Sequence, residues 1–574
     1  MAPRPLRAAP VPSPLALTLL AFTLFVAAPR TAPAATITIV NLDGAGEGFN
    51  DPTARAPVGG NPGTTLGGQR LNVFQHAAAI WGGILSSAVE IKVEAKFDPQ
   101  FCTATSAVLG SAGPITVDKD FSGAELADTW YCAALVNKMA GVDLAPADND
   151  IGITFNSAVD DSVCLGSRSW YYGYDGNEGT DIEMLPVVLH EIGHGLGFLT
   201  LVNGSAGTEF FGSPDVYERF MLDITTGKHW DEMTDAERMA SATNNGNLVW
   251  DGPAVTFKAP LTLGPRPKLI VNAPAVIAGT MAMGRASFGA ELATPGLTRA
   301  IVLADDGSGT ISDACSALIN AAQVSGEIAL VDRSGSCTDL VKAQNVQAAG
   351  GAGILLVDNV VSATPPTLRG TDATLTLTVG GVRQADGNTI RAQLGAGVNV
   401  TMTVDPTRLS GADDSHRLLL FAPSPLQGGS SLSHWDVQAY PNLLMEPALN
   451  TSLHDDVDLA RELFEDIGWL PRVTAVGETG PVVAELRHNT PNPFGAATTI
   501  PFALERAGSA ELSVFDVSGR LVRRLAQGWL EAGAHALTWD GTDAQGRRVA
   551  PGVYLYRLTA GGFAGARHMV MVSR

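Results

Sequence analysis

Residues 185–200, LPVVLHEIGHGLGFLT, contain two histidines four positions apart and a glutamate directly after the first of them. On a helix, side chains four positions apart share a face, so His190 and His194 can present their imidazoles to one metal ion. Glu191 projects beside that ion and is placed to accept a proton from a metal-bound water. The apolar residues on both sides of the pattern predict the helix that this arrangement requires. Together these residues predict a zinc-dependent hydrolase with Glu191 as the general base.

A catalytic zinc normally takes three protein ligands, and a third is not evident beside these two. The pattern His-Glu-x-x-His-x-x-Gly, which ends at Gly197, resembles that of the metzincins. In that family the glycine turns the chain, so that a histidine three residues later reaches the zinc. Thr200 stands at this position here, and a threonine hydroxyl is a poor zinc ligand. The third ligand is therefore elsewhere in the chain, or the site is inactive.

Residues 431–470, SLSHWDVQAYPNLLMEPALNTSLHDDVDLARELFEDIGWL, supply a candidate for this ligand. They resemble a segment of the leishmanolysins, which are metzincins with a long insertion between the glycine and the third histidine. The resemblance implies that His434 is the third ligand and that Met445 is the Met-turn residue beneath the metal. A helix is predicted independently at the end of this segment, because apolar residues recur at helical spacing and a glycine follows them: Val457, Ala460, Leu463, Phe464, Ile467 and Gly468.

Several other residues compete for roles at such a site. A gluzincin takes its third ligand from a glutamate on a later helix, and Glu218 lies 24 residues after His194, although the expected Asn-Glu-x-x-x-Asp context is missing. His416 and His454 flank the leishmanolysin-like segment and are candidates for substrate binding. The remaining histidines are expected to be structural or at the surface: His76, His229, His488, His535 and His568.

The chain between the ligands changes in composition at residues 268–405, which are rich in Ala, Gly and Val and poor in aromatic residues. Within them, residues 326–359, GEIALVDRSGSCTDLVKAQNVQAAGGAGILLVDN, predict a strand, a turn, a helix and a second buried strand. This order resembles the protease-associated (PA) domain, with a generic βαβ unit as the alternative. Because the segment lies between the ligands, one hypothesis places it beside the cleft, where it would restrict which substrates enter.

The C-terminal residues 486–574 read as short alternating strands punctuated by Gly, Asp and Pro, which is typical of a small β-sandwich. The stretches NPF, VFDVSGR, WDGTD and GVYLYRL resemble the flagellar-hook-cap-type immunoglobulin-like module of exported bacterial proteins. That resemblance implies a structural or sorting role, with the export machinery as a partner. No catalytic constellation is evident in this part of the sequence.

The N-terminus predicts an export signal over residues 1–35, because Arg4 and Arg7 precede the apolar run LALTLLAFTLFVAA and the small residues APAA. No later segment is long and apolar enough to cross a membrane, so we expect no stable span after signal cleavage. The net charge of −21 comes from dispersed acidic residues and argues against nucleic acid as a partner. The expected location is therefore outside the cell, either free or at its surface.

The chain has five cysteines, an odd number, and an exported protein permits disulfides. Cys315 and Cys337 lie in one segment and form a candidate pair. Only two of the other three cysteines can pair with each other, so one is left unpaired: Cys102, Cys132 and Cys164. None stands in a CxxC motif, which argues against a cysteine-based zinc site.

Residues 66–85 place apolar residues at helical spacing, and residues 89–97 alternate strictly between apolar and polar, so the sequence predicts a helix followed by a half-buried strand. We therefore expect a multidomain protein in which an α+β metzincin-like catalytic domain is interrupted by a PA-like α/β insertion and followed by an all-β Ig-like sandwich. The expected boundaries are 36–201 and 418–470 for the two catalytic parts, 202–267 for an insertion linker region, 268–405 for the PA-like domain, 471–485 for a linker and 486–574 for the sandwich. The expected function is that of a secreted endopeptidase acting on proteins or peptides with one catalytic zinc; a calcium ion stays open as a further cofactor, with no residues assigned. The alternative is an exported binding or adhesion protein with a degenerate peptidase core.

Overall fold

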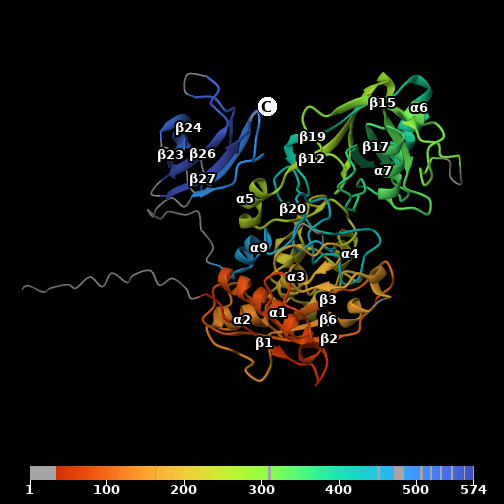
Figure 1. Cartoon of the computed structure of the whole chain (residues 1–574). Coiled ribbons are helices and arrows are strands. Elements are labelled where there is room, and N and C mark those ends of the chain that lie inside the picture. The colour runs from red at the N-terminus through yellow and green to blue at the C-terminus, as the bar shows by residue number, and fades with distance from the viewer. Residues whose placement is uncertain are drawn as a thin grey trace, which may run out of the picture.

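The structure is a computed structural model that describes residues 34–161, 163–307, 312–448, 453–470, 484–504, 508–516, 520–530, 533–543, 547–560 and 563–572. Residues 1–33 and 471–483, which carry nearly all of the expected export signal and linker, lie outside this range. No helix among the described residues is both long enough and apolar enough to cross a bilayer. In Figure 1 the N-terminal part of the chain lies at the bottom, and the inserted sheet and the C-terminal strands lie above it on opposite sides.

The first part of the chain forms a four-stranded sheet, in the order β1 (Ile37–Asn41), β2 (Ile91–Asp98), β6 (Ile151–Asn156) and β3 (Gly110–Pro114). The first three strands are parallel, whereas β3 pairs antiparallel with β6 at the edge. Along β2 every second side chain is buried, as the sequence alternation predicts. Two short ribbons and a helix complete this part: β4 (Val117–Asp118) with β5 (Tyr131–Cys132), β7 (Trp170–Tyr171) with β8 (Ile182–Glu183), and α2 (Ala133–Ala140).

Two helices pack together beside this sheet, namely α1 (Leu66–Ile84) and α3 (Met184–Gly195). The fully buried Trp81 of α1 joins them, since its indole N–H donates a 3.0 Å hydrogen bond to the carbonyl of Leu189 on α3. The N-terminus of α1 is capped by Thr65, whose side chain accepts a hydrogen bond from the amide of Gly68. The helix that the apolar periodicity predicts near residues 66–85 is therefore present.

A late segment of the chain, α9 (Ala460–Ile467), packs into the same core. All five apolar residues of the predicted helical stripe are buried in that core, and Phe464 lies edge-to-face against Trp81 with ring centroids 5.1 Å apart. Gly468 ends the helix at φ 108°, a left-handed conformation that suits glycine. The next residue, Trp469, donates its indole N–H to the carbonyl of Leu196 at 2.8 Å. Segments far apart in sequence therefore share one core.

Residues 202–267, for which the sequence predicts an insertion linker region, are folded against this core instead. They form the sheet β10 (Lys228–His229), β9 (Met221–Asp223) and β11 (Leu248–Trp250), which β20 (Leu418–Leu419) completes, and the helices α4 (Asp235–Ser241) and α5 (Pro253–Thr262). The Asp466 carboxylate of α9 accepts hydrogen bonds from the indole of Trp250 and from the amide of Ala254 at the start of α5. The buried tryptophans of this region, Trp230 and Trp250, belong to the same hydrophobic core as α1, α3 and α9.

The insertion that follows is built on one eight-stranded mixed sheet. Its order is β13 (Gly279–Ala282), β12 (Pro265–Ala273), β19 (Asn399–Leu409), β15 (Leu297–Leu303), β16 (Ile328–Asp332), β17 (Gly353–Val357), β18 (Thr378–Val382) and β14 (Gly284–Arg285). Strands β15 to β18 are parallel, and the helices between and after them are α6 (Ala321–Val324), α7 (Asp339–Ala348) and α8 (Gln384–Ala392). The predicted strand, turn, helix and strand correspond to β16, α7 and β17.

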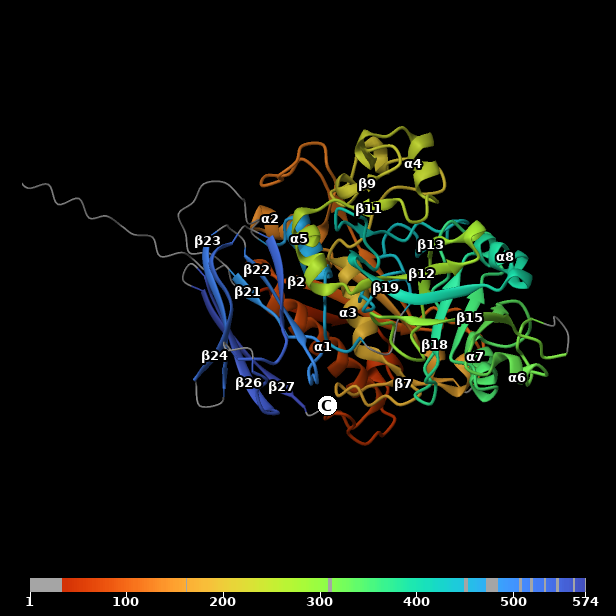
Figure 2. The same cartoon turned by 90° about the horizontal axis from the view of Figure 1, so that it is seen from above.

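The C-terminal part consists of two antiparallel sheets with a core of their own. One sheet holds β21 (Ala484–Leu486), β22 (Thr498–Leu504) and β25 (Gly533–Trp539), and the other holds β24 (Leu521–Leu530), β23 (Gly508–Asp516), β26 (Gly552–Ala560) and β27 (Phe563–Met571). This part contacts the rest of the chain near α5, where Lys258 pairs with Glu485 at 2.7 Å. Figure 2 shows it on the side of the molecule opposite to the inserted sheet.

Four of the five cysteines form disulfides, and the odd one is buried. Cys315 pairs with Cys337, the candidate pair within the inserted segment, and Cys102 pairs with Cys164 in the first part of the chain. Cys132 remains a free thiol, and burial raises its pKa to about 12.

Phe464 is fully buried where α9 meets α1. Replacing it with Ala should therefore lower the free energy of unfolding of the part that contains α1, α3 and α9 by about 3–5 kcal/mol. A denaturant titration followed by tryptophan fluorescence measures this change. The matched control is Phe211→Ala, at a side chain that is 82% exposed, which should change the stability by about 0.5 kcal/mol or less. Equal losses in the two variants would contradict the role given to α9.

Candidate metal centre

Helix α3 carries His190, Glu191 and His194, and it ends where the chain turns at Gly197. Gly197 has φ 114°, and a Cβ at this position would lie 3.1 Å from the Ile467 side chain and 3.2 Å from the Cys132 sulfur. Both the backbone angle and the space therefore require glycine here. The turn directs the chain away from the helix, as the sequence pattern predicts.

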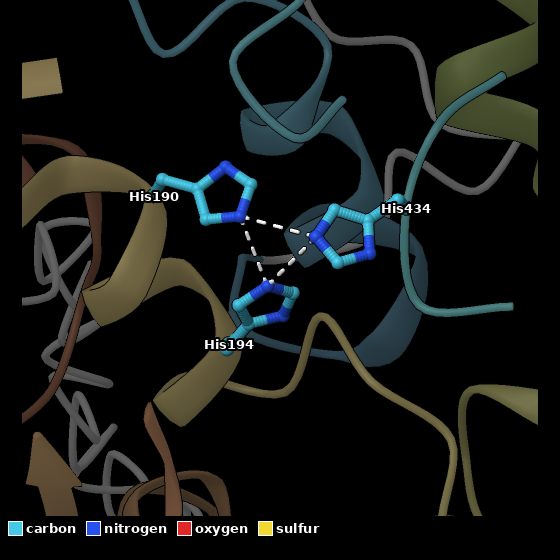
Figure 3. Close-up of side chains that lie close together, drawn as sticks. All are labelled: His190, His194 and His434. Atoms are coloured by element: carbon cyan, nitrogen blue, oxygen red, sulfur yellow. Dashed lines mark hydrogen bonds between the residues drawn. The ribbon is translucent and has the colours of Figure 1, made fainter. Parts of the chain in front are cut away.

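The structure brings His434 to the two histidines of α3, across 240 residues of sequence. The Nε2 atoms of the three rings lie 3.1 Å (His190 to His194), 3.2 Å (His190 to His434) and 3.3 Å (His194 to His434) apart. Figure 3 shows these nitrogens facing a common point, with two rings projecting from α3 and the third from the later segment. His190 and His434 are less than one-tenth exposed.

Each of the three rings is oriented by a backbone carbonyl at its other nitrogen. The Nδ1 atoms lie 2.6 Å from the oxygen of Leu444, 2.8 Å from that of Phe198 and 2.7 Å from that of Ser430, for His190, His194 and His434 respectively. A carbonyl only accepts hydrogen bonds, so each Nδ1 carries the proton. In a neutral imidazole the other nitrogen, Nε2, then carries a lone pair.

Burial keeps these imidazoles neutral. It lowers the pKa of His190 to about 3 and that of His194 to about 4, and it holds the pKa of His434 well below its usual range. Three lone pairs that converge within 3.1–3.3 Å repel one another unless a cation lies between them. A tetrahedral zinc ion with bonds of about 2.0–2.1 Å separates its nitrogens by about 3.3–3.4 Å, so the donor set fits such an ion.

Met445 lies under the helix that carries two of these histidines. Its side chain is fully buried, and a Cβ added at Gly193 would lie 2.9 Å from its sulfur. Its carbonyl accepts a hydrogen bond from the amide of Trp435, the residue after His434. The methionine thus packs against α3 at Gly193 and is joined through its backbone to the residue after His434.

Glu191 faces a cleft of about 810 Å³ next to the histidines. A Cβ added at Gly110 of β3 would lie 3.1 Å from the Glu191 carboxylate, so this glycine leaves room for it. Burial raises the pKa of Glu191 to about 8. The cleft is lined by β3 and the residues before it, by α3, and by the segments 428–434 and 446–448. None of the described residues of the insertion 268–405 lines this cleft.

The competing candidates lie elsewhere or serve other purposes. The Thr200 hydroxyl donates to the Asp215 carboxylate at 2.8 Å, and the Thr200 amide donates to the Ser433 hydroxyl beside His434. Glu218 is fully buried, with its carboxylate near the Asp215 amide, and it is not part of the cluster of histidine nitrogens.

The two other histidine candidates lie outside the three-histidine cluster. His454 pairs with the Glu183 carboxylate at 2.6 Å, just before α3, and this contact raises its pKa. Glu183 lies on the wall of the cleft. His416 lies in a turn with φ 66°, where its amide donates to the Asp413 carbonyl.

Sequence reasoning missed the groups that orient the site. The carbonyls of Leu444, Phe198 and Ser430 belong to the backbone, so no residue type marks them. Asp215 was also missed, although its carboxylate holds the amide of Leu201 at 2.6 Å and so fixes the chain after the helix. An aspartate in a turn-like stretch is a common feature and offers no distinct signal.

Two ranges of the chain match known families. Residues 297–390 match the PA domain, and residues 492–562 match the FlgD Ig-like domain. The chain therefore contains a PA domain between His194 and His434 and an FlgD-type Ig-like domain in its C-terminal part, which confirms these two resemblances. Neither range includes the three histidines, so the metzincin resemblance stays a prediction.

Each of the similar proteins matches only a part of this chain. The basal-body rod modification protein FlgD of Salmonella typhimurium is 41% identical over 70 residues, which are 12% of this chain and 30% of the relative. The chain thus spans less than a third of that relative. FlgD from Xanthomonas campestris is 25% identical over 16% of this chain and 67% of its own, with a TM-score of 0.12. BSAP, a zinc aminopeptidase from Bacillus subtilis, is 22% identical over 25% of this chain and 31% of its own, with a TM-score of 0.19. TM-scores this low support no transfer of fold or activity.

The close approach of Met445 to α3 predicts that Gly193→Ala weakens the site. The new methyl group would have to displace the methionine sulfur, at a cost of about 1–3 kcal/mol in stability and with weaker zinc retention. The control is Gly83→Ala in α1, where nothing lies within 4 Å and the higher helix propensity of Ala should stabilise slightly. Thermal unfolding with and without zinc measures both effects, and equal behaviour of the two variants would refute the packing argument.

Proposed function

We propose that this chain is a secreted zinc endopeptidase of the metzincin type, resembling the leishmanolysins. The observation that carries the proposal is the convergence of three imidazole nitrogens, all with their lone pairs inward, next to a buried glutamate in one cleft. Three nitrogen ligands leave one coordination position open, as a catalytic rather than a structural zinc requires.

In this proposal His190, His194 and His434 hold the zinc, which when bound acts as a Lewis acid toward water and the scissile carbonyl. A cation held beside Glu191 would favour its carboxylate form, which would accept a proton from the attacking water and pass it to the leaving amine. Its position on α3, beside the ligands and facing the cleft, serves this role. Met445 takes no part in the chemistry and supports α3 through its contact near Gly193.

The shape of the cleft supports a polypeptide as substrate. Strand β3 is the edge of its sheet, and it lines the cleft along its whole length, from Gly110 to Pro114. An edge strand offers backbone N–H and C=O groups to an extended peptide, which can add to the sheet as a further strand. A chain bound in this way would run past Glu191 and the histidines, which favours cleavage within a polypeptide.

The remaining parts of the proposal concern location. The N-terminal signal predicted from the sequence and the two disulfides agree with a protein that matures outside the cytoplasm. The FlgD-type domain would then act as a structural or export module. The alternative, a binding protein with a degenerate peptidase core, is disfavoured because Glu191 and all three histidines are present and converge.

Replacing Glu191 with Gln tests the mechanism most directly. The variant should keep about one zinc per chain, since the ligands are unchanged, while kcat/KM for a casein-derived peptide should fall by about 10²- to 10⁴-fold. Metal analysis and a peptide-cleavage assay, with and without a chelator, measure the two effects. Full activity in this variant would rule out the proposed role of Glu191.

Two further variants separate the candidates for the third ligand. His434→Ala should lose both zinc and activity, because two imidazoles alone hold the ion weakly. Glu218→Gln, which keeps the shape of the buried side chain, should retain both. The reverse result would identify the site as a gluzincin site.

A further inference from the structure

The PA domain contacts residues 437–448, the chain segment that follows the third histidine. The hydroxyl of Thr367 donates to the carbonyl of Val437 at 3.1 Å. Further along, the guanidinium of Arg285 lies 3.7 Å from the centre of the Tyr440 ring, and the Tyr440 hydroxyl donates to Glu291 at 2.8 Å. The insertion therefore contacts the segment after His434, while none of its described residues lines the cleft itself.

Arg369 of the PA domain contacts the residues that follow Met445. Its guanidinium lies 3.2 Å from the carboxylate of Glu446, the residue after Met445, and also donates to the carbonyl of Ala448 at 3.2 Å. Glu446 is only 1% exposed, so burial raises its pKa, whereas the Leu443 amide and the Arg369 guanidinium oppose this shift and favour the carboxylate. A carboxylate this deeply buried is costly unless a cation pairs with it. Arg369, from a separate domain, supplies that cation.

The Glu446 carboxylate also stabilises the turn at residues 443–446, which orients His190. Its other oxygen accepts a 2.9 Å hydrogen bond from the amide of Leu443. The next residue, Leu444, offers the carbonyl that fixes Nδ1 of His190 at 2.6 Å. A continuous path of contacts thus leads from Arg369 through Glu446 and this turn to His190.

We propose that Arg369 is a positioning residue of the metal centre, through which the PA domain holds the turn beneath the three histidines. This inference rests on the proposed function, since it assigns the domain a role in zinc binding. Groups that orient metal ligands typically contribute about 10- to 100-fold to metal affinity. On this basis the PA domain acts on the centre through its contacts with this turn, and the hypothesis that it restricts entry to the cleft stays a separate prediction.

The test is the zinc dissociation constant of Arg369→Met in the full chain, measured by competition with a chromophoric chelator. Met keeps the length of the aliphatic stem but removes the charge, so zinc should bind about 10- to 100-fold more weakly than in the wild type. Arg369→Lys, which keeps the charge, should recover most of this loss. The matched control is Arg383→Met, because Arg383 pairs with Asp386 inside the same domain, away from the turn. Its zinc affinity should equal that of the wild type.

A second pair of variants shows whether the effect passes through Glu446. In the background Glu446→Gln the buried charge is already absent, so adding Arg369→Met should change the zinc affinity by less than about threefold. An unchanged affinity in Arg369→Met alone, or an equal loss with and without Glu446, would overturn the inference. A wild-type chain that binds no zinc and cleaves no peptide would instead refute the proposed function, so the two failures are distinguishable.

Discussion

The structure depends on one constraint, which is that three neutral imidazoles from two distant segments must direct their lone pairs at the same point. Neutrality comes from burial, and direction comes from three backbone carbonyls that hold the opposite ring nitrogens of His190, His194 and His434. Neutrality and orientation are both needed. A charged ring repels a cation, and a freely rotating ring does not hold its lone pair toward the cation. The helices, turns and aromatic contacts around the site serve to satisfy both conditions together.

The long insertion is compatible with this convergence because the parts on either side of it share one core. Residues after the insertion contact residues before it. The Phe464 ring packs on Trp81, and the Trp469 indole donates a hydrogen bond to the carbonyl of Leu196. Loop closure costs free energy that grows only logarithmically with loop length, and a folded insertion costs less. Residues 202–267 extend the shared core, and the PA domain rests on the segment after His434. The insertion is thus anchored at more than its two ends.

Much of this arrangement follows from residue patterns, and the remainder does not. Helical and strand periodicity predicted α1, β2, α7 and α9, and spacing on α3 placed His190 and His194 on one face. His434 and Met445 came from a resemblance, since nothing local to their sequence marks them. The carbonyls that orient the histidine rings could not be predicted from the sequence, because backbone atoms are the same in every residue. The pairing of Arg369 with Glu446 was equally out of reach, since a tertiary contact between two common charged residues leaves no periodic or spacing signal.

The order of the ligands along the chain has a consequence for biosynthesis. His190 and His194 leave the ribosome well before His434, and the whole PA domain is translated between them. A nascent chain therefore presents a pair of imidazoles first and completes the triad only when synthesis has passed position 434. A product that terminates inside the insertion lacks the third imidazole, whatever the state of its N-terminal half. In the proposed peptidase, a complete set of metal ligands is thus tied to translation proceeding beyond the inserted domain.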